Sequence, residues 1–388
     1  MSKLVKKELE GEDLLEATRE RVDYIFENYE AVFIANSGGK DSMSCHNVMM
    51  DGVERNGPME HSIMSVFHDN ETPYPETVEM FKRECERWGD DMHIWWTVVP
   101  YVASLMTHPE EQSWKVPWDE RDPESWIREM PTWISEYENI TMMRPDHPYF
   151  DDWEIGDRHY DTSYQIIEGY MEEHDLEHDE VIELVGLRAE ESMNRYSSII
   201  NLEGWIAEEK SDGAPCHIGY PVYDWGTSDL WMIHDQEDWD YNEFYDKMNH
   251  LGEAPANVRN GPPWGAYPVR AGKAYQARHL WPERFERWEQ RYPGCVLAFD
   301  FGYDLFEADF SKPEDETWEE MTAKVLNSFD EDEREDRKEL VEDRLDRHWN
   351  HSDVPLKQSE DCPVCGLSWE QMAGDLIEWL RNYHEEVH

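Results

Sequence analysis

The chain has 388 residues, of which 39% are hydrophobic and 13% aromatic, and this excludes a disordered acidic polypeptide because such chains are poor in aromatic residues. Asp and Glu number 89 against 35 Lys and Arg, so the formal net charge is −54. This charge excludes non-specific attraction to nucleic acid or anionic lipid as the main mode of binding, and it does not indicate nucleic acid as a partner, although it leaves one possible.

Short apolar runs that alternate with helical patterns predict a twisted, parallel α/β sheet with helices on both faces. The runs cover residues 31–35, 63–67, 94–99 and 181–185. An amphipathic helix is expected over 11–29 and another from Pro75. The helix that follows the first run is expected to stop at Gly52, because glycine often ends helices.

Three further parts are expected beside this sheet. Residues 101–180 are too many for a loop in a compact domain, so they are predicted to form a mostly helical insertion in a nucleotide-binding domain of residues 1–235. Residues 236–345 are expected to form a mainly helical extension. Residues 346–388 are expected to form a small module around a Cys-x-x-Cys pair.

The acidity and the cysteine content bear on where the protein works. Acidic residues are spread along the whole chain, which favours a salt-loving source, since molar salt screens the self-repulsion of such a surface. Six cysteines are too few for a disulfide scaffold at this length, so a reducing cytoplasm is expected. No run approaches about 18 apolar residues and residues 1–10 are too charged for a signal peptide, so no membrane partner is expected.

The strongest signal is the segment Ser-Gly-Gly-Lys-Asp-Ser at residues 37–42, between the first predicted strand and the next helix. Glycines let the backbone approach a ligand closely, and a helix start offers unpaired N–H groups and a positive dipole end to an anion. Lys40 adds a cation, and Asp41 can hold Mg²⁺ or orient the loop. The predicted phosphate-binding residues are Ser37, Gly38, Gly39, Lys40, Asp41 and Ser42.

This segment resembles the SGGxDS pyrophosphate loop of the PP-loop ATP pyrophosphatases. It lacks the G-x-x-x-x-G-K-[ST] spacing of kinases and GTPases. Residues 186–195, Gly-Leu-Arg-Ala-Glu-Glu-Ser-Met-Asn-Arg, resemble the G-[IL]-R-x-x-E-S-x-x-R segment of the phosphoadenosine phosphosulfate reductase family, a branch of the PP-loop enzymes. Asp69 opens a match to that family's D-x-x-x-x-[FY]-P-E-T segment, and residues 220–231 resemble a further element after its last sheet strand.

The resemblance covers roughly residues 20–265 and implies an adenine nucleotide alpha-hydrolase-like fold. It implies an adenine nucleotide across the carboxyl ends of the strands, in agreement with the rule for open α/β sheets. Beyond the loop, the implied nucleotide-binding residues are Asp69, Gly186, Arg188 and Arg195. Guanidinium forks suit phosphate or sulfate, although the two arginines could also belong to an ordinary surface ion-pair cluster.

The sequence departs from true members of that family at the thiol that carries out the reduction. Those enzymes use a cysteine in a C-terminal E-C-G-[IL]-H segment, whereas Cys295 stands in Tyr-Pro-Gly-Cys-Val, and no four-cysteine set for an iron–sulfur cluster is present. The preferred hypothesis is therefore adenylation of an unknown acceptor by ATP, with Lys40, Asp41 and Arg188 as the catalytic residues. Alternatives are a sulfonucleotide reductase that uses an external thiol, and a non-catalytic nucleotide-sensing or DNA-associated regulator.

The C-terminal Cys362-Pro-Val-Cys365 knuckle is typical of zinc sites, because two thiolates at this spacing can bind one tetrahedral ion. His384 and His388 are four residues apart and are the favoured remaining ligands of Zn²⁺. The other candidate pair is His348 and His351. A reduced Cys-x-x-Cys turn without metal is the alternative.

Overall fold

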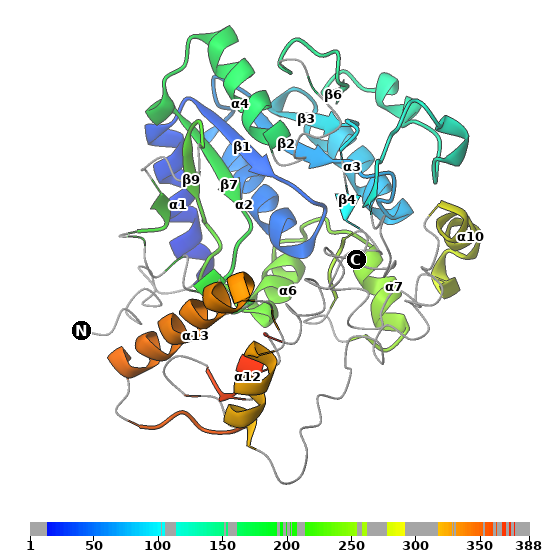
Figure 1. The fold of residues 1–388 in the computed structure, drawn as a ribbon. Coiled ribbons are helices and arrows are strands. Elements are labelled where there is room, and N and C mark those ends of the chain that lie inside the picture. The colour runs from blue at the N-terminus through cyan, green and yellow to red at the C-terminus, as the bar shows by residue number, and fades with distance from the viewer. Residues whose placement is uncertain are drawn as a thin grey trace. The chain divides into compact units, whose positions relative to one another are not determined.

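The structure is a computed structural model, in which the chain forms two compact units (Figure 1). The first unit comprises Met1–His108 and Ser113–Gly302, and the second comprises Pro109–Gln112 and Tyr303–His388. The described residues are 14–101, 103–104, 114–150, 153, 161–191, 195–196, 199, 202, 204–207, 214–253, 258–261, 278–291, 317–327, 329, 331–351, 354–359, 362, 367–369, 372–373 and 376.

The first unit is built on a seven-stranded sheet in the order β6-β3-β2-β1-β7-β9-β8. All neighbours are parallel except β8, which pairs antiparallel with β9. The strands are β1 (Ala31–Ala35), β2 (Ile63–His68), β3 (Met92–Thr97), β6 (Ile140–Met143), β7 (Val181–Val185), β8 (Ile206–Ala207) and β9 (His217–Gly219). The four predicted strands are confirmed as β1, β2, β3 and β7.

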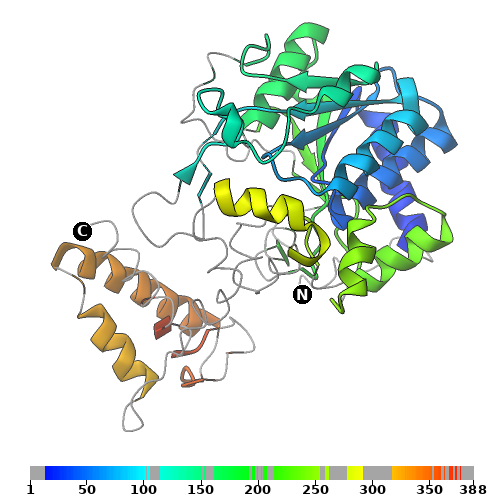
Figure 2. The same cartoon turned by 90° about the vertical axis from the view of Figure 1, so that its right-hand side faces the viewer.

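Helices cover both faces of this sheet, as predicted (Figure 1). The α-helices of the unit are α1 (Leu14–Asn28), α2 (Lys40–Asn56), α3 (Pro75–Trp88), α4 (Asp161–His174), α6 (Thr227–Gln236), α7 (Phe244–His250) and α10 (Pro282–Arg291). Short 3-10 helices span Gly89–Asp91, Pro123–Ser125, Thr132–Glu136 and His178–Glu180. Figure 2 shows α10, in yellow, on the side of the unit that faces the viewer.

Strand β1 explains why the predicted runs are continuously apolar. Val32 and Ile34 pack on one face with residues of α1, α2 and α3, whereas Phe33 packs on the other face with Ile166 and Ile167 of α4. A strand that is buried on both faces has no solvent side to carry polar residues, so alternation disappears. The sheet is therefore the central layer between two apolar clusters.

Helix α2 does not stop at Gly52, so that prediction is wrong. The helix continues to Asn56 and ends at Gly57, whose φ of 89° is accessible to glycine. A Cβ atom at Gly52 would lie 2.7 Å from Cε2 of Phe26 on α1. The glycine therefore permits the close approach of α1 and α2.

The prediction of a mostly helical insertion over 101–180 stays a prediction, because part of the stretch lies outside the described residues. That stretch contributes β6 to the edge of the main sheet and holds a small antiparallel pair, β4 (Ala103–Ser104) and β5 (Trp114–Lys115). Its single described α-helix is α4. Ile140 pairs with Ile94 of β3, so this part of the insertion belongs to the sheet itself.

The second unit contains two described helices, α12 (Trp318–Leu326) and α13 (Glu331–His351). A capping box between Thr317 and Glu320 starts α12. Val325, Val341 and Leu376 share one apolar cluster. The boundaries predicted at residues 235 and 345 stay predictions. Among the residues described in either unit, no helix is long and apolar enough to cross a bilayer.

Glu183 lies in the middle of β7, opposite Phe33, and burial raises the pKa of its carboxyl to about 7. Since this folded-state pKa exceeds the unfolded value near 4.5, stability is lost as the pH rises from about 4.5 to 7. We expect Glu183→Gln to remove that loss and to be about 2–3 kcal/mol more stable than the wild type at pH 8. Denaturant titrations of both proteins between pH 5 and 8 measure the difference, and parallel pH profiles would contradict the assignment.

Candidate nucleotide-binding site

The predicted phosphate loop lies at the topological switch point of the sheet, where the strand order reverses. Strand β1 has β2 on one side and β7 on the other, and the chain reaches these neighbours through connections that diverge from this point. Residues 36–39 leave the carboxyl end of β1 and lead into α2, which begins at Lys40. Such a crevice is where open α/β sheets bind ligands.

Side chains within the loop hold its backbone in a defined shape. The Gly38 N–H donates to Oδ1 of Asn36 at 2.9 Å, and the Ser37 N–H donates to Oγ of Ser42 at 3.2 Å. Gly38 has a φ of 67°, and a Cβ atom there would lie 2.7 Å from Cγ2 of Thr77. Glycine is therefore required at this position for its φ and for the close packing against α3. Ser37 is exposed.

The start of α2 differs from the sequence expectation of unpaired N–H groups. Gly39, the N-cap residue, provides no side-chain cap, but the Lys40 N–H donates to the Tyr245 hydroxyl oxygen at 2.7 Å. The Lys40 side chain is buried, with Nζ 3.1 Å from the carbonyl oxygen of Val258 and 3.5 Å from Oδ2 of Asp41. Burial lowers the pKa of Lys40, and the neighbouring Asp41 carboxylate opposes this.

Arg188 joins the loop to the end of β7. Its Nε lies 2.5 Å from Oδ1 of Asp41, and the guanidinium is buried with Nη1 3.2 Å from the carbonyl oxygen of Trp225. A Cβ atom at Gly186 would lie 2.5 Å from the backbone carbon of Asp41. The two sequence motifs are thus brought into direct contact. Because both Asp41 oxygens face cations, this carboxylate is suited to orienting the loop, and its role as a Mg²⁺ ligand stays a prediction.

Two other predicted residues have different surroundings. Asp69 is buried and accepts hydrogen bonds from Nε1 of Trp96 at 2.8 Å and from Arg128, although its neighbours His68 and Asn70 line the cavity described next. Arg195 forms an ion pair with Glu191 at 2.8 Å and is partly exposed. Neither side chain lines that cavity.

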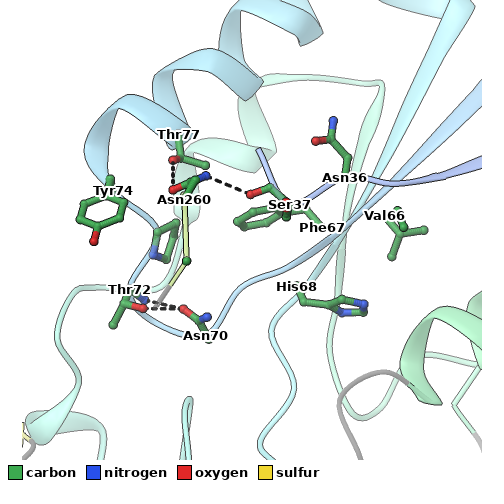
Figure 3. Close-up of a pocket in the computed structure, with 13 residues that line it drawn as sticks. Asn36, Ser37, Val66, Phe67, His68, Asn70, Thr72, Tyr74, Thr77 and Asn260 are labelled. Atoms are coloured by element: carbon green, nitrogen blue, oxygen red, sulfur yellow. Dashed lines mark hydrogen bonds between the residues drawn. The ribbon is translucent and has the colours of Figure 1, made fainter. Parts of the chain in front are cut away.

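A cavity of about 210 Å³ opens beside the loop at the carboxyl ends of β1 and β2 (Figure 3). Asn260 and Thr77 lie on one side of it, and Val66 and His68 on the other. Its lining combines apolar with polar side chains: Ala35, Val66, Phe67, Pro73 and Tyr74 with Asn36, Ser37, His68, Asn70, Thr72, Thr77 and Asn260. Concave apolar walls with a few polar groups are typical of small-molecule sites.

Three loop-holding residues come from a part of the chain to which the sequence analysis assigned no role in the site. Asn242 Nδ2 donates to the Gly38 carbonyl oxygen at 2.9 Å, and Asn260 Nδ2 donates to the Ser37 carbonyl oxygen at 3.0 Å. Tyr245 completes the set through the Lys40 N–H. These contacts span about 200 positions of sequence, so no pattern near the loop indicates them.

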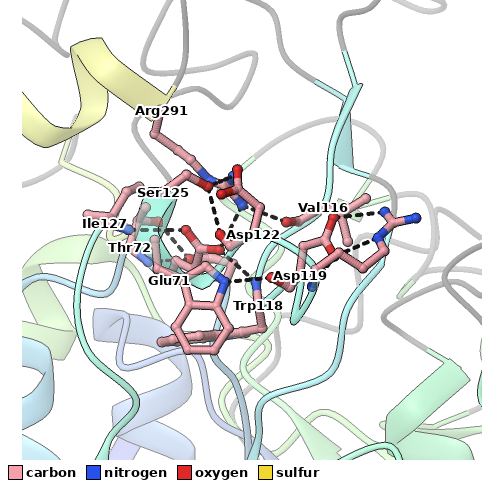
Figure 4. Close-up of polar contacts among 12 residues, drawn as sticks. Glu71, Thr72, Val116, Trp118, Asp119, Asp122, Ser125, Ile127 and Arg291 are labelled. Atoms are coloured by element: carbon pink, nitrogen blue, oxygen red, sulfur yellow. Dashed lines mark hydrogen bonds and ion pairs between the residues drawn. The ribbon is translucent and has the colours of Figure 1, made fainter.

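A buried ionic cluster holds the insertion against the carboxyl end of β2 (Figure 4). Glu71 is fully buried, has a φ of 70° and lies 3.0 Å from Nη2 of Arg291 at the end of α10. The same carboxylate accepts from the Trp118 N–H at 2.6 Å, and Arg291 donates to the Val116 carbonyl oxygen at 2.7 Å. Burial raises the pKa of Glu71, and Arg291 opposes this.

The zinc site stays a prediction, because most of its favoured ligands are not among the described residues. Cys365, His384 and His388 lie outside the described residues, whereas the backbone N–H of Cys362 donates to the Leu367 carbonyl oxygen at 2.9 Å. His348 is buried, and its Nε2 donates to the Val354 carbonyl oxygen at 2.8 Å; no side-chain placement is described for His351. Within the described residues, no group of three or more His, Cys, Asp and Glu side chains is arranged to hold a metal ion.

No protein family model matches the chain. It is 25% identical over 390 residues to the uncharacterized protein YbdN of Escherichia coli K12, and the alignment covers 95% of this chain and 89% of the relative. Three solved structures show weaker similarity to this chain.

The first is a phosphoadenylyl-sulfate reductase from Candida auris in a phosphate complex, with a TM-score of 0.33 and 15% identity over 61% of this chain and 85% of that chain. The second is the U34-tRNA thiolase NcsA from Methanococcus maripaludis with its [4Fe-4S] cluster, with a TM-score of 0.34 and 10% identity over 76% of this chain and 80% of that chain. The third is the FMN adenylyltransferase of Candida glabrata with FAD and pyrophosphate, with a TM-score of 0.30 and 11% identity over 63% of this chain and 65% of that chain. Such low TM-scores do not establish a shared fold, so we infer function from this chain's own residues.

Proposed function

We propose that the chain binds ATP at the carboxyl ends of β1, β2 and β7 and transfers AMP to an acceptor, with release of pyrophosphate. The observation that carries this proposal is the contact between residues 37–42 and Gly186–Arg188 beside an open cavity. The exposed Ser37 connects the loop to that cavity. Phosphates would lie along the loop, and the adenosine would occupy the cavity.

Charge supports an anionic ligand at this point of the molecule. The chain carries a net charge of −54, yet two buried cations, Lys40 and Arg188, stand directly behind the loop. Among the described residues, Asp41 pairs with both cations, and Glu190 lies 4.0 Å from Arg188. Buried cations act through a low effective dielectric and are screened less by salt than surface charges. They would stabilise the negative charge that develops as the α-phosphorus is attacked and pyrophosphate leaves.

The side chains that line the cavity are suited to the nucleoside part of ATP. Phe67 and Tyr74 offer apolar and aromatic surface, while Asn70 and Asn260 offer amide donors and acceptors. A flat heteroaromatic base with polar edges fits this combination. The protein would then act by positioning: the triphosphate is held at its phosphate end by the loop and at its base end by the cavity.

Three of the four cysteines in the described regions favour adenylation over reduction by their own thiols. Cys45, Cys85 and Cys216 are buried, and burial raises the pKa of each thiol. A nucleophilic cysteine needs the opposite, a lowered pKa and access to the substrate. A sulfonucleotide reductase built on these three residues would therefore depend on an external thiol.

The proposed function is tested by the products formed from ATP. Incubation with ATP, Mg²⁺ and cell extract in molar salt should yield AMP and pyrophosphate, and ADP with phosphate would contradict the proposal. We expect Lys40→Ala to raise the dissociation constant for ATP at least tenfold, since it removes a buried cation at the loop. Lys82→Ala is the matched control, because Lys82 is a surface residue paired with Glu79 on α3. Unchanged ATP affinity in a folded Lys40→Ala protein would refute the site.

A further inference from the structure

A second cavity, of about 510 Å³, lies next to the nucleotide cavity at the start of α3. Pro73 and Tyr74 line the first cavity, and Pro75 lines the second, so the two share one stretch of backbone. We call the second cavity the acceptor pocket. Its walls include the apolar side chains of Pro75, Ile127 and Trp281 and the cationic side chains of Arg284 and Arg287 on α10.

The two arginines of the acceptor pocket bind backbone carbonyl oxygens, whereas two nearby arginines pair with carboxylates. Arg128 is paired with Asp69, and Arg291 with Glu71. Arg284 donates to the carbonyl oxygen of Pro73, and Arg287 lies 3.5 Å from the carbonyl oxygen of Trp126.

Within the described part of the chain, neither Arg284 nor Arg287 has a carboxylate within ion-pair distance. Glu283 lines the same cavity but does not pair with them. In a chain with 89 acidic residues against 35 basic ones, two adjacent guanidinium groups without a carboxylate partner need an explanation.

The surroundings of Arg284 indicate a cation prepared for an anion. Burial and the nearby Arg128 guanidinium lower the pKa of Arg284 to about 10, against the opposing influence of Asp69, Glu76 and Tyr74. The group is therefore charged at neutral pH while partly removed from water. A desolvated cation without a paired anion is unfavourable, and a bound oxyanion would relieve this.

We propose that the acceptor pocket binds an oxyanion, a carboxylate or a sulfate, attached to an apolar or aromatic body. Arg284 and Arg287 hold the oxyanion, and Trp281 with Ile127 receives the body. The inference rests on the proposed function in one respect: the anionic compound is the acceptor that meets the nucleotide across Pro73–Pro75. Binding of the oxyanion itself depends only on this pocket.

Benzoate and phenyl sulfate are suitable probes, and neutral benzamide is the matched control ligand. Calorimetric titration of the whole protein should show saturable binding of at least one of the two anions and none of benzamide. The preferred anion identifies the oxyanion class. We expect Arg287→Met and Arg284→Met each to weaken that binding at least tenfold, and Arg87→Met, which removes an exposed arginine at the far end of α3, to leave it unchanged.

ATP binding, measured on the same proteins, separates this inference from the proposed function. ATP binding retained without any anion binding would overturn the acceptor pocket and leave the nucleotide site intact. Anion binding without ATP binding would support the pocket and refute the nucleotide site. Equal anion affinity in wild type and Arg287→Met, which alters an exposed side chain and does not threaten folding, would also overturn the assignment.

Discussion

Gly186→Ala is expected to lower the free energy of unfolding by about 3 kcal/mol and to abolish nucleotide binding. The added Cβ atom would lie 2.5 Å from the carbon and the oxygen of the Asp41 carbonyl and 2.6 Å from the Ser42 nitrogen. All three are backbone atoms at the start of α2, so no side chain can rotate away to make room. The segment after β7 or the loop must move, and either movement breaks the ion pair between Asp41 and Arg188.

Denaturant unfolding and ATP titration of the same preparation check this prediction. Gly204→Ala is the matched control, because the nearest atom to a Cβ there lies 4.0 Å away. The control should lose less than about 0.5 kcal/mol and should bind ATP like the wild type. A Gly186→Ala protein with wild-type stability would show that the two segments do not touch. Lost stability with unchanged ATP affinity would show that the contact is structural only.

The parts of the fold that the sequence predicts are those with local signals. Strand β1 is a five-residue apolar run followed by two glycines, and its type and end can be inferred without knowledge of its neighbours. The same holds for β7 and Gly186. Strand β6 has no such signal: of its four residues only the two at the ends are buried, and its place is fixed by pairing with β3, more than 40 positions earlier.

The candidate site divides in the same way. The glycine-rich loop and Arg188 could be identified because their residue types are constrained by what they hold. The contacts of Asn242, Tyr245 and Asn260 with the loop could not, because only the folded chain brings these side chains to the loop carbonyls and the Lys40 N–H. For the same reason the sequence predicts unpaired N–H groups at the start of α2, because the Tyr245 hydroxyl that accepts from the Lys40 N–H is about 200 positions away in sequence.

Arg291→Met is expected to destabilise the protein by about 3–5 kcal/mol at pH 7, because it leaves the Glu71 carboxylate buried without its cation. Glu71 would keep its hydrogen bond from the Trp118 N–H, which is not enough to replace a charge partner. The loss also frees the end of α10, the helix that carries Arg284 and Arg287. Thermal and denaturant unfolding measure the stability.

Two further variants separate a buried charge from a lost contact. Arg121→Met is the control, because Arg121 pairs with Asp119 in the same insertion at 2.7 Å but is 70% exposed, so no measurable loss of stability is expected. Glu71→Gln combined with Arg291→Met should recover most of the stability, since no ionised group is then left buried.

The pH dependence gives a second test. Burial raises the pKa of Glu71, so acidification toward pH 5 should reduce the difference in stability between Arg291→Met and the wild type as the carboxyl takes up its proton. Two results together would contradict this explanation: a stability difference that stays constant with pH, and a double variant no more stable than Arg291→Met. They would mean that Arg291 stabilises the protein by packing and by its hydrogen bonds to Val116 and Ser125, and that the charge of Glu71 plays no part.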